Sequence, residues 1–365
     1  MLSSDAQKAG KPPSRVTISD VADAIGVTKS TVSRALNGYP DISEKMRLKV
    51  RNAVEELGYR PMAQAQAIRT GRARAMGLVL QIDEHDAHRP FLTNFLAGLS
   101  EAASRELWTL TVATARSTED TLKTIGRLVE ERKADGFILP RTYIEDARVD
   151  YLRAHDVPFV LYGRTGDMAG CASYDILGER AMEDAVVRLA ELGHRRIAFI
   201  NGGEAYNYSV LRREGFEAGL RRAGLPLDPA LMAAPALTTM EGCARARTLM
   251  ELSLPPTAFV CAVDTAALGV YRAVGELGLT VGQHVSVISY DGIPDGETAS
   301  PPLTTFAVDS HRAGGRLAHL LIARIRGEAP ETLRETEAAR LLLRGSDRPP
   351  LMPSPELAAV LRDRA

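Results

Sequence analysis

The chain has 365 residues, 45% of them apolar and 25% charged, which is typical of a protein with two or three domains and a sizeable core. No apolar run approaches the roughly 18 residues of a membrane span, and residues 1–15 have no apolar signal segment and are expected to be a disordered lead. The three widely spaced cysteines favour buried thiols in a reducing, cytoplasmic location over a metal site.

The formal net charge of −1 hides an asymmetry between the two ends of the chain. Residues 1–75 carry 13 Lys and Arg against 7 Asp and Glu, whereas the remainder carries 32 against 39. A basic segment joined to an acidic body favours a first part that binds a polyanion. On this count alone, a chance local excess of solvated charge explains the asymmetry about as well.

Residues 16–60 carry the signals of three short helices. Thr17, three residues before Asp20, predicts a capped start for the first helix, and Gly26 predicts its end. Thr28 is a good N-cap for a second helix that ends at Asn37 and Gly38. Ser43 caps a third, which ends at Gly58. The side chains expected to face inward are Ile18, Val21, Ala22, Ile25, Val32, Ala35, Leu36, Met46, Val50, Val54 and Leu57.

Two short helices joined by a tight glycine turn and covered by a third make a helix-turn-helix unit. Its second helix would place N-terminal residues in the major groove of DNA. Lys29, Ser30 and Arg34 lie opposite the inward face; arginine suits bidentate contacts to guanine, and short hydroxyls reach phosphates. The alternative is a three-helix protein-interaction module with a solvated polar face.

The segments VTISDVADAIGVTKSTVSRALNG, ISEKMRLKVRNAVEELGYRP and AIRTGRARAMGLVL resemble the headpiece and hinge of the lactose-repressor (LacI/GalR) family of bacterial transcription regulators. The resemblance implies operator binding, in which the residues matching Lys29, Ser30 and Arg34 read bases and the first two set the operator preference. The residues expected to contact double-stranded DNA are Thr17, Lys29, Ser30, Thr31, Ser33, Arg34, Asn37 and Ile68.

Residues 61–75 are expected to be a hinge. By itself the segment PMAQAQAIRTG is too short for a stable helix, and a plain linker is the simpler interpretation. The resemblance implies a helix that folds on the operator and wedges an apolar side chain into the minor groove. This chain has Ile68 where a leucine is usual in the family and Met62 where an asparagine is common. The stiffer, β-branched isoleucine keeps the wedge but leaves the extent of the DNA kink open.

Residues 76–345 alternate short apolar runs with helical stretches, which predicts an α/β fold with parallel sheets flanked by helices. The length favours two similar lobes with a cleft between them. The family resemblance, through LGHRRIAFING, RREGFEAGL and SPPLTTFAVD, implies a two-lobed effector and dimerisation domain like that of periplasmic sugar-binding proteins. The apolar runs are GLVLQI, TLTVATA, GFILP, PFVLYG, RIAFING, AFVCAV and VSVISYDG, and the expected helices are 92–106, 118–133, 178–192, 210–223, 265–277 and 310–327.

The tail, residues 346–365, has several prolines and no leucine heptad, so no added tetramerising helix is expected. Gly193-His194-Arg195-Arg196 looks catalytic in isolation. Because it follows a predicted helix, capping of the last carbonyls by its cations is the favoured role.

Ligands of open α/β sheets bind at the carboxyl ends of the strands. The resemblance matches Arg212 to an arginine that clamps effector hydroxyls or carboxylates, Asp291 to an acid that accepts sugar hydroxyls, and Phe91 to a residue that packs on the ligand. Val263 replaces a common asparagine, so the ligand need not be a familiar galactoside. The expected effector-binding residues are His88, Phe91, Arg141, Arg164, Tyr174, Asp175, Tyr206, Asn207, Arg212, Asp264 and Asp291.

Enzyme motifs are missing from the sequence: it has no GxGxxG after a strand, no Walker loop, no HExxH and no nucleophile elbow, and its seven histidines include no pair at metal spacing. The sequence therefore predicts a non-enzymatic, cytoplasmic, homodimeric regulator, a repressor of a palindromic operator, that needs no cofactor and responds to a small ligand, with a sugar favoured. The alternatives are a solute-binding protein without regulatory role and a carbohydrate-active enzyme on the same body.

Overall fold

The computed structural model describes residues 16–59, 72–81, 90–203 and 205–364, and of residues 90, 91 and 364 it describes the backbone alone. The chain divides into two compact units, Met1–Ala73 and Arg74–Ala365, and each is considered by itself. Within the described residues, no helix is long and apolar enough to cross a membrane.

The first unit is a bundle of three helices whose ends follow the predicted caps. They are α1 (Ile18–Ile25), α2 (Lys29–Leu36) and α3 (Glu44–Leu57). Thr17 and Asp20 form a reciprocal capping box, and Thr28 and Ser43 each accept a backbone N–H of the first turn. Gly26 and Gly58 end α1 and α3 in the left-handed conformation.

The core of this bundle is small. Its buried residues are Val21, Ala22, Val32, Ala35, Val50 and Ala53. Leu57, which was expected to face inward, is instead 37% exposed, because it lies in the last turn of α3, where the neighbouring helices no longer cover it. Ala53, one turn earlier, occupies the buried position.

The second unit contains two sheets of six strands, one in each lobe. In the first lobe the strand order is β11-β5-β4-β3-β1-β2, and all the neighbouring strands are parallel. In the second the order is β12-β10-β9-β8-β6-β7, where only β12 runs antiparallel to its neighbour. The strands are β1 (Ala75–Gln81), β2 (Thr109–Ala115), β3 (Gly136–Pro140), β4 (Phe159–Tyr162), β5 (Ala172–Ile176), β6 (Ile197–Ile200), β7 (Met232–Ala233), β8 (Ala258–Cys261), β9 (Ser286–Asp291), β10 (Thr304–Ala307), β11 (Arg334–Glu337) and β12 (Arg340–Leu342).

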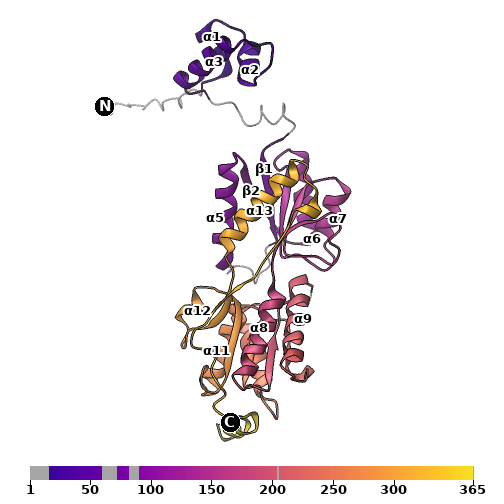
Figure 1. Ribbon diagram of the computed structural model, residues 1–365, viewed down its shortest axis with the longest axis vertical. Coiled ribbons are helices and arrows are strands. Elements are labelled where there is room, and N and C mark those ends of the chain that lie inside the picture. Colours follow the sequence, from indigo (N-terminus) through magenta and orange to yellow (C-terminus); the bar gives the residue numbers. More distant parts are fainter. Residues whose placement is uncertain (1–15, 60–71, 82–89, 204, 365) are drawn as a thin grey trace, which may run out of the picture. The chain divides into compact units, whose positions relative to one another are not determined.

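Helices cover both faces of each sheet, as parallel strands require. In the first lobe α5 (Pro90–Arg105) and α13 (Ser310–Ile325) lie side by side on one face (Figure 1), and α6 (Thr118–Glu130) and α7 (Ala147–Ala154) cover the other. In the second lobe the paired helices are α8 (Gly178–Glu191) with α9 (Asn207–Arg222) and α10 (Thr239–Met250) with α11 (Asp264–Glu276). A short helix, α12 (Asp295–Thr298), follows β9.

Glycines allow α5 and α13 to approach closely. A Cβ atom on Gly98 would stand 1.9 Å from the carbonyl oxygen of His311, and one on Gly314 would stand 2.4 Å from that of Phe95. No side chain fits at either position, so the two backbones are in direct contact. This close packing joins a segment near the start of the unit to one near its end.

The chain crosses between the lobes three times, in the segments 176–178, 308–310 and 337–340 (Figure 1). Each lobe is therefore built from sequence-distant segments: α13 and β11 return to the first lobe, and β12 belongs to the second. The carboxyl ends of the parallel strands in both lobes contribute to the space between them, which sets the place for a ligand.

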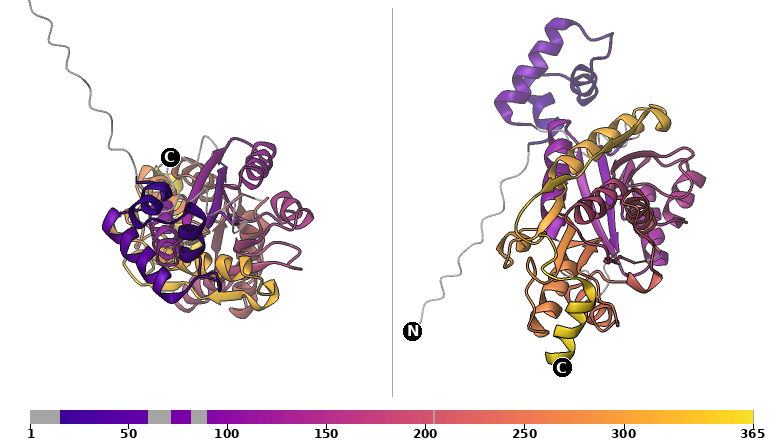
Figure 2. Two further views of the ribbon diagram at one scale, coloured as in Figure 1. Left: turned by 90° about the horizontal axis from the view of Figure 1, so that it is seen from above. Right: turned by 60° about the horizontal axis from the view of Figure 1, so that its bottom comes forward.

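The tail is part of the second lobe. Figure 2 shows its helix α14 (Ser354–Arg364) at the C-terminal end of the chain. The helix buries Leu357 and Ala358, and Ser346 and Asp347 are buried before it. The 193–196 segment also serves structure: Arg195 Nη1 donates to the carbonyl of Ala190, as predicted. The buried His194 bonds Thr257 and the carbonyl of Arg348, which ties the tail to the lobe. All three cysteines are buried free thiols, as expected.

Candidate functional site

The outer face of α2 is polar and open. Lys29, Ser30 and Arg34 are exposed, whereas Val32 and Ala35 on the opposite side are buried against α1 and α3. The helix therefore fixes its polar face through a small apolar stripe. In a helix-turn-helix this second helix is the one that reads base edges.

Arg34 is already oriented by its neighbours. Its Nη2 donates to the Asp41 carboxylate, and its guanidinium lies over the ring of Tyr39, 5.1 Å from the centroid. The hydrogen bond from Arg34 lowers the pKa of Asp41, which stays ionised at neutral pH. The arginine is 45% exposed, so a target can still reach its remaining donors.

The other predicted DNA contacts are engaged locally. Thr17 is part of the capping box of α1, and Thr31 shares a hydrogen bond with Thr28. Asn37 donates to the carbonyl of Ser33 and to its hydroxyl. These bonds fix the ends of α1 and α2. Lys29, Ser30 and Arg34 remain as the exposed polar surface of α2. Met62 and Ile68 lie outside the described residues.

A cavity of about 210 Å³ lies between the two lobes of the second unit. The first lobe contributes the ends of β3, β4 and β5; the second contributes α9, the start of α11 and the end of β9. Its lining consists of Pro140, Arg141, Thr142, Tyr162, Gly163, Arg164, Asp175, Ile176, Gly178, Glu179, Tyr208, Leu211, Arg212, Leu237, Val263, Thr265, Tyr290, Asp291, Ile293, Val308 and Ser310. Five of the residues expected to bind effector meet here: Arg141, Arg164, Asp175, Arg212 and Asp291.

Arg212 packs against two aromatic rings. Its guanidinium carbon is 4.7 Å from the ring centroid of Tyr208 and 4.0 Å from that of Tyr290. Its Nη1 donates to the carbonyl of Ala262 over 2.6 Å. Because Arg212 packs on two rings and its Nη1 is already bonded, a ligand is left to approach its remaining donors.

Asp291 ends β9 in an unusual backbone conformation, with φ at 124°. Burial raises the pKa of its carboxyl to about 7, although Arg212 and Arg141 partly oppose that rise. The following turn is held by Asp264, whose carboxylate accepts the backbone N–H groups of Gly292 and Ile293. The unusual backbone conformation of Asp291 directs the end of β9 into the cavity.

On the side of the first lobe, Arg164 binds two carboxylates. Its Nε donates to Asp175 and its Nη2 to Glu179, both over 2.5 Å. Burial raises the pKa of Asp175, and Arg164 opposes that rise. Arg164 therefore lies between two carboxylates where the chain crosses from β5 to α8.

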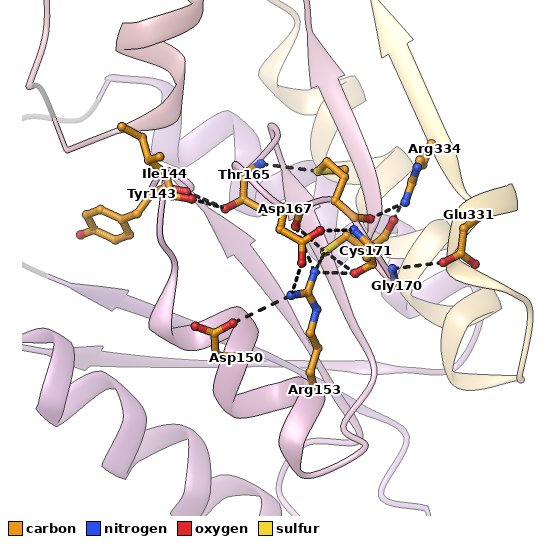
Figure 3. Close-up of polar contacts among 12 residues, drawn as sticks. Tyr143, Ile144, Asp150, Arg153, Thr165, Asp167, Gly170, Cys171, Glu331 and Arg334 are labelled. Atoms are coloured by element: carbon orange, nitrogen blue, oxygen red, sulfur yellow. Dashed lines mark hydrogen bonds and ion pairs between the residues drawn. The ribbon is translucent and has the colours of Figure 1, made fainter.

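The loop that carries Arg164 is anchored at its far end (Figure 3). Arg153 Nη1 donates to Asp167, and its Nη2 donates to the carbonyls of Asp167 and Ala169 and to the Cys171 sulfur. Thr165 donates to the carbonyl of Tyr143 over 2.7 Å. These bonds hold the loop from β4 to β5 in place, so Arg164 starts from a fixed backbone.

A second arginine binds the same loop from the edge of the sheet (Figure 3). Arg334, at the start of β11, donates to the carbonyls of Cys171 and Met168, and Gly170 N–H donates to Glu331. The residues from the end of the chain thus brace the loop next to the cavity.

The lobes also contact each other directly beside the cavity. Tyr143 and Tyr206 form an isolated antiparallel bridge, and their rings stack with centroids 5.0 Å apart. Asn207 N–H donates to the carbonyl of Thr142, and its side chain donates to the carbonyl of Arg164. Tyr206 in turn stacks on Tyr208 at 5.4 Å. A continuous set of rings therefore runs from the first lobe to Arg212.

The structure corrects the placement of four expected effector contacts, which do not line the cavity. Tyr174 is 2% exposed in the core of the first lobe, and its hydroxyl donates to Glu337. Asp264 is completely buried and holds the turn after β9. Tyr206 and Asn207 make the contact between the lobes. Tyr174 lies within β5 and the other three follow strands, but sequence position does not reveal that their side chains face the protein.

His88 lies outside the described residues, as does the side chain of Phe91 at the start of α5. The lining residues that were not predicted include Tyr162, Glu179, Tyr208 and Tyr290. Tyr162 and Tyr290 lie at the carboxyl ends of β4 and β9, so the rule that identified Asp291 could have found them. Glu179 and Tyr208 begin helices, and only the fold brings them to the site. No group of potential metal ligands occurs among the described residues.

A helix-turn-helix unit followed by a two-lobed domain with a cavity between its lobes defines a DNA-binding transcription regulator with a ligand-binding domain. Residues 17–62 match the family described as "Bacterial regulatory proteins, lacI family", and residues 186–346 match the "Periplasmic binding protein-like domain". The chain is 36% identical over 359 residues to the HTH-type transcriptional regulator AglR of Rhizobium meliloti (strain 1021), covering 94% of this chain and 99% of AglR.

The HTH-type transcriptional regulator RafR of Escherichia coli is 30% identical over 327 residues, 88% of this chain and 95% of RafR. Among solved structures, the lac repressor dimer bound to operator and the anti-inducer ONPF has a TM-score of 0.77 at 26% identity, covering 92% of this chain and 99% of that one. The complex of the transcriptional regulator CelR with cellobiose has a TM-score of 0.71 at 29% identity, covering 91% and 100%. The chain belongs to the lacI family of bacterial regulatory proteins.

Proposed function

We propose that this regulator is a repressor whose affinity for its operator is set by a sugar bound between the lobes of its second unit. The observation that carries the proposal is the cavity itself. It combines Arg212, Asp291 and Glu179 from one lobe with Arg164 and Asp175 from the other, and tyrosine rings line it. A sugar offers hydroxyls to such charged groups and C–H faces to the rings.

The printed title of one solved relative, the CelR complex, supports a sugar, since that regulator binds cellobiose. The ligand of this chain need not be the same one. Leu211, Leu237 and Val263 narrow the cavity with apolar side chains, and Val263 offers no hydrogen bond.

The proposed mechanism is a shift in the relative orientation of the lobes. A ligand that contacts both lobes stabilises the orientation in which its contacts are all made, and operator affinity changes with the population of that state. The hinge, residues 61–75, carries this change to the headpiece, with Ile68 as the proposed minor-groove wedge. The bases are read by Lys29, Ser30 and Arg34. The DNA backbone is contacted, or the reading helix is supported, by Thr17, Thr31, Ser33 and Asn37.

We further infer a homodimer on a palindromic operator, because two copies of one recognition helix read two symmetric half-sites. The lac repressor structure, a dimer bound to operator, supports this assembly for a chain of the same family.

The experiment is a fluorescence-anisotropy titration of the full-length protein into labelled DNA from upstream of its own gene, with and without each member of a panel of mono- and disaccharides. The expected result is specific binding that one sugar changes at least ten-fold. Specific binding that no sugar in the panel changes would contradict the proposed effector class.

A further inference from the structure

The second lobe leaves one donor and one acceptor unpartnered at the edge of the cavity. Arg212 Nε and Glu179 Oε2 are buried, and neither has a hydrogen-bond partner among the described residues. Of the five buried side-chain atoms in that state within the described chain, these two belong to residues that line the cavity. Buried polar groups are costly to leave unpaired, so the two atoms mark positions that a ligand can satisfy.

Arg212 packs directly against the first turn of α8. Gly178, the first residue of α8, lines the cavity beside it. A Cβ atom on Gly178 would stand 2.9 Å from Arg212 Nε, and its next nearest neighbours would be Cγ and Cδ of the same arginine. A residue without a side chain therefore allows Arg212 to lie in this position, close to the start of the helix that carries Glu179.

Glu179 requires the opposite kind of partner. Its Oε1 accepts from Arg164, so the carboxylate is held in place while Oε2 faces no donor. An ionised carboxylate only accepts hydrogen bonds, so a ligand group beside Oε2 has to donate. A carboxylate or phosphate group of a ligand cannot donate there and would be repelled.

We propose, building on the sugar-responsive function above, that the cavity selects neutral, polyhydroxylated ligands and rejects their anionic counterparts, with Glu179 and Arg212 as the selecting pair. A hydroxyl group both accepts and donates, so hydroxyls of one neutral sugar satisfy Arg212 Nε and Glu179 Oε2. Three arginines and three carboxylates line the described part of the cavity, a formal balance that favours no net ligand charge.

Helix ends at the cavity favour anions but do not change this conclusion. The N-caps of α8 and α11 make no side-chain capping bond, and such helix ends attract negative charge. The protein already provides that charge, however, through Glu179 in the first turn of α8 and Asp264 in the first turn of α11. A ligand needs to bring only hydrogen-bond acceptors, which neutral hydroxyls supply.

The test uses matched pairs of sugars that differ in charge: glucose with glucuronate, galactose with galacturonate, and cellobiose with cellobiouronate. Melting temperature and calorimetric titration are measured on the full-length protein. The expected result is that the neutral member of at least one pair binds and that its acid binds at least ten-fold more weakly.

Two variants test the residues. Glu179→Gln should weaken binding of the neutral sugar roughly ten- to a hundred-fold and reduce the preference of the protein for the neutral sugar over the acid. Glu183→Gln, the same change on α8 outside the cavity lining, should do neither. Gly178→Ala should also weaken binding of the sugar, because its Cβ displaces the Arg212 side chain from its position at the cavity. Gly275→Ala is its control, since a Cβ there meets nothing within 4 Å.

Tighter binding of the acid in any pair, or unchanged sugar affinity and unchanged neutral preference in Glu179→Gln, would overturn the inference and leave the sugar-responsive function standing. If neither member of any pair binds and no sugar changes operator affinity, the proposed function itself is contradicted and this inference with it.

Discussion

The headpiece and the cavity hold their charged side chains in opposite ways. Arg34 on α2 is exposed and pairs with Asp41, seven residues along the chain. Arg164 and Arg212 are half-buried. Arg164 pairs with residues 11 and 15 positions away, and the contacts of Arg212 lie 4, 50 and 78 positions away. Solvent screens the first kind of interaction and only weakly the second. The headpiece is therefore suited to exchange its partners for DNA, whereas the cavity is built to hold one fixed geometry.

The strongest test of this difference is Arg212→Ala. Removing a half-buried cation that packs on two rings should lower sugar affinity roughly a hundred-fold, because ligand acceptors lose a charged donor. Operator affinity without sugar should change less than about three-fold. Arg213→Ala is the matched control, because that arginine is exposed on α9 and pairs with Glu217. Calorimetric titration of sugar into both variants measures the effect; equal affinities in the two would remove Arg212 from the site.

Arg34→Ala tests the headpiece in the same way. Loss of a base-reading arginine should cost about 1–3 kcal/mol of operator binding and relax sequence preference at one position in each half-site. Sugar affinity and headpiece stability should stay as in the wild type, because the Arg34–Asp41 pair is exposed. Anisotropy titrations on operator and on scrambled DNA separate specific from non-specific binding. Wild-type operator affinity in the variant would mean that α2 is not the reading helix.

Asp291→Asn tests the cost of the buried acid. The pKa of Asp291 in the folded protein, about 7, lies above its ordinary value of 3.8. Between these values the folded protein holds a proton that the unfolded chain has released, so the free energy of unfolding falls as the pH rises through that window. Without sugar, the variant should be more stable than the wild type at pH 8, by on the order of 1–3 kcal/mol, since a tenfold change in acidity corresponds to about 1.4 kcal/mol.

The advantage of Asp291→Asn should shrink as the pH falls to 5, where the wild-type carboxyl is protonated in the folded state. Thermal melts at several pH values check this. A stability difference that does not vary with pH would show that Asp291 does not titrate in this window.

Tyr206→Ala gives the smallest effect. It removes the ring stacked between Tyr143 and Tyr208, worth roughly 0.5–1.5 kcal/mol beyond the buried area. Sugar affinity should fall by a few-fold, because the lobes lose part of their direct contact, and operator affinity should hardly change. Tyr151→Ala, a stacked ring on α7 outside the cavity lining, is the control. Equal sugar affinity in both variants would mean that the contact between the lobes is not coupled to the ligand.

Sequence reasoning succeeded where the signals are local. The caps at Thr17, Thr28 and Ser43 defined three helices, and apolar runs defined most central strands. It missed β5, because Ser173 and Asp175 interrupt the apolar pattern of a buried strand. It also missed β7, β10, β11 and β12 and the helices α7, α10, α12 and α14, several of which are too short for a periodic signal.

The cavity could be predicted only in part. Strand ends identified Arg141, Arg164, Asp175 and Asp291 because parallel strands align their carboxyl ends. The direction of a side chain at such an end depends on the tertiary structure, and this is why Asp264 was placed in the cavity although it is buried behind it. Cavity residues at the starts of helices and at the crossovers between the lobes have no sequence pattern that predicts their place in the cavity.

The most direct test of the account is the operator affinity of the full-length protein with and without the neutral sugar that binds it, measured for the wild type and for Arg212→Ala by anisotropy. The account predicts at least a ten-fold change in the wild type and none in the variant, from the same affinity without sugar. An equal change in both proteins would show that the signal does not enter through this cavity.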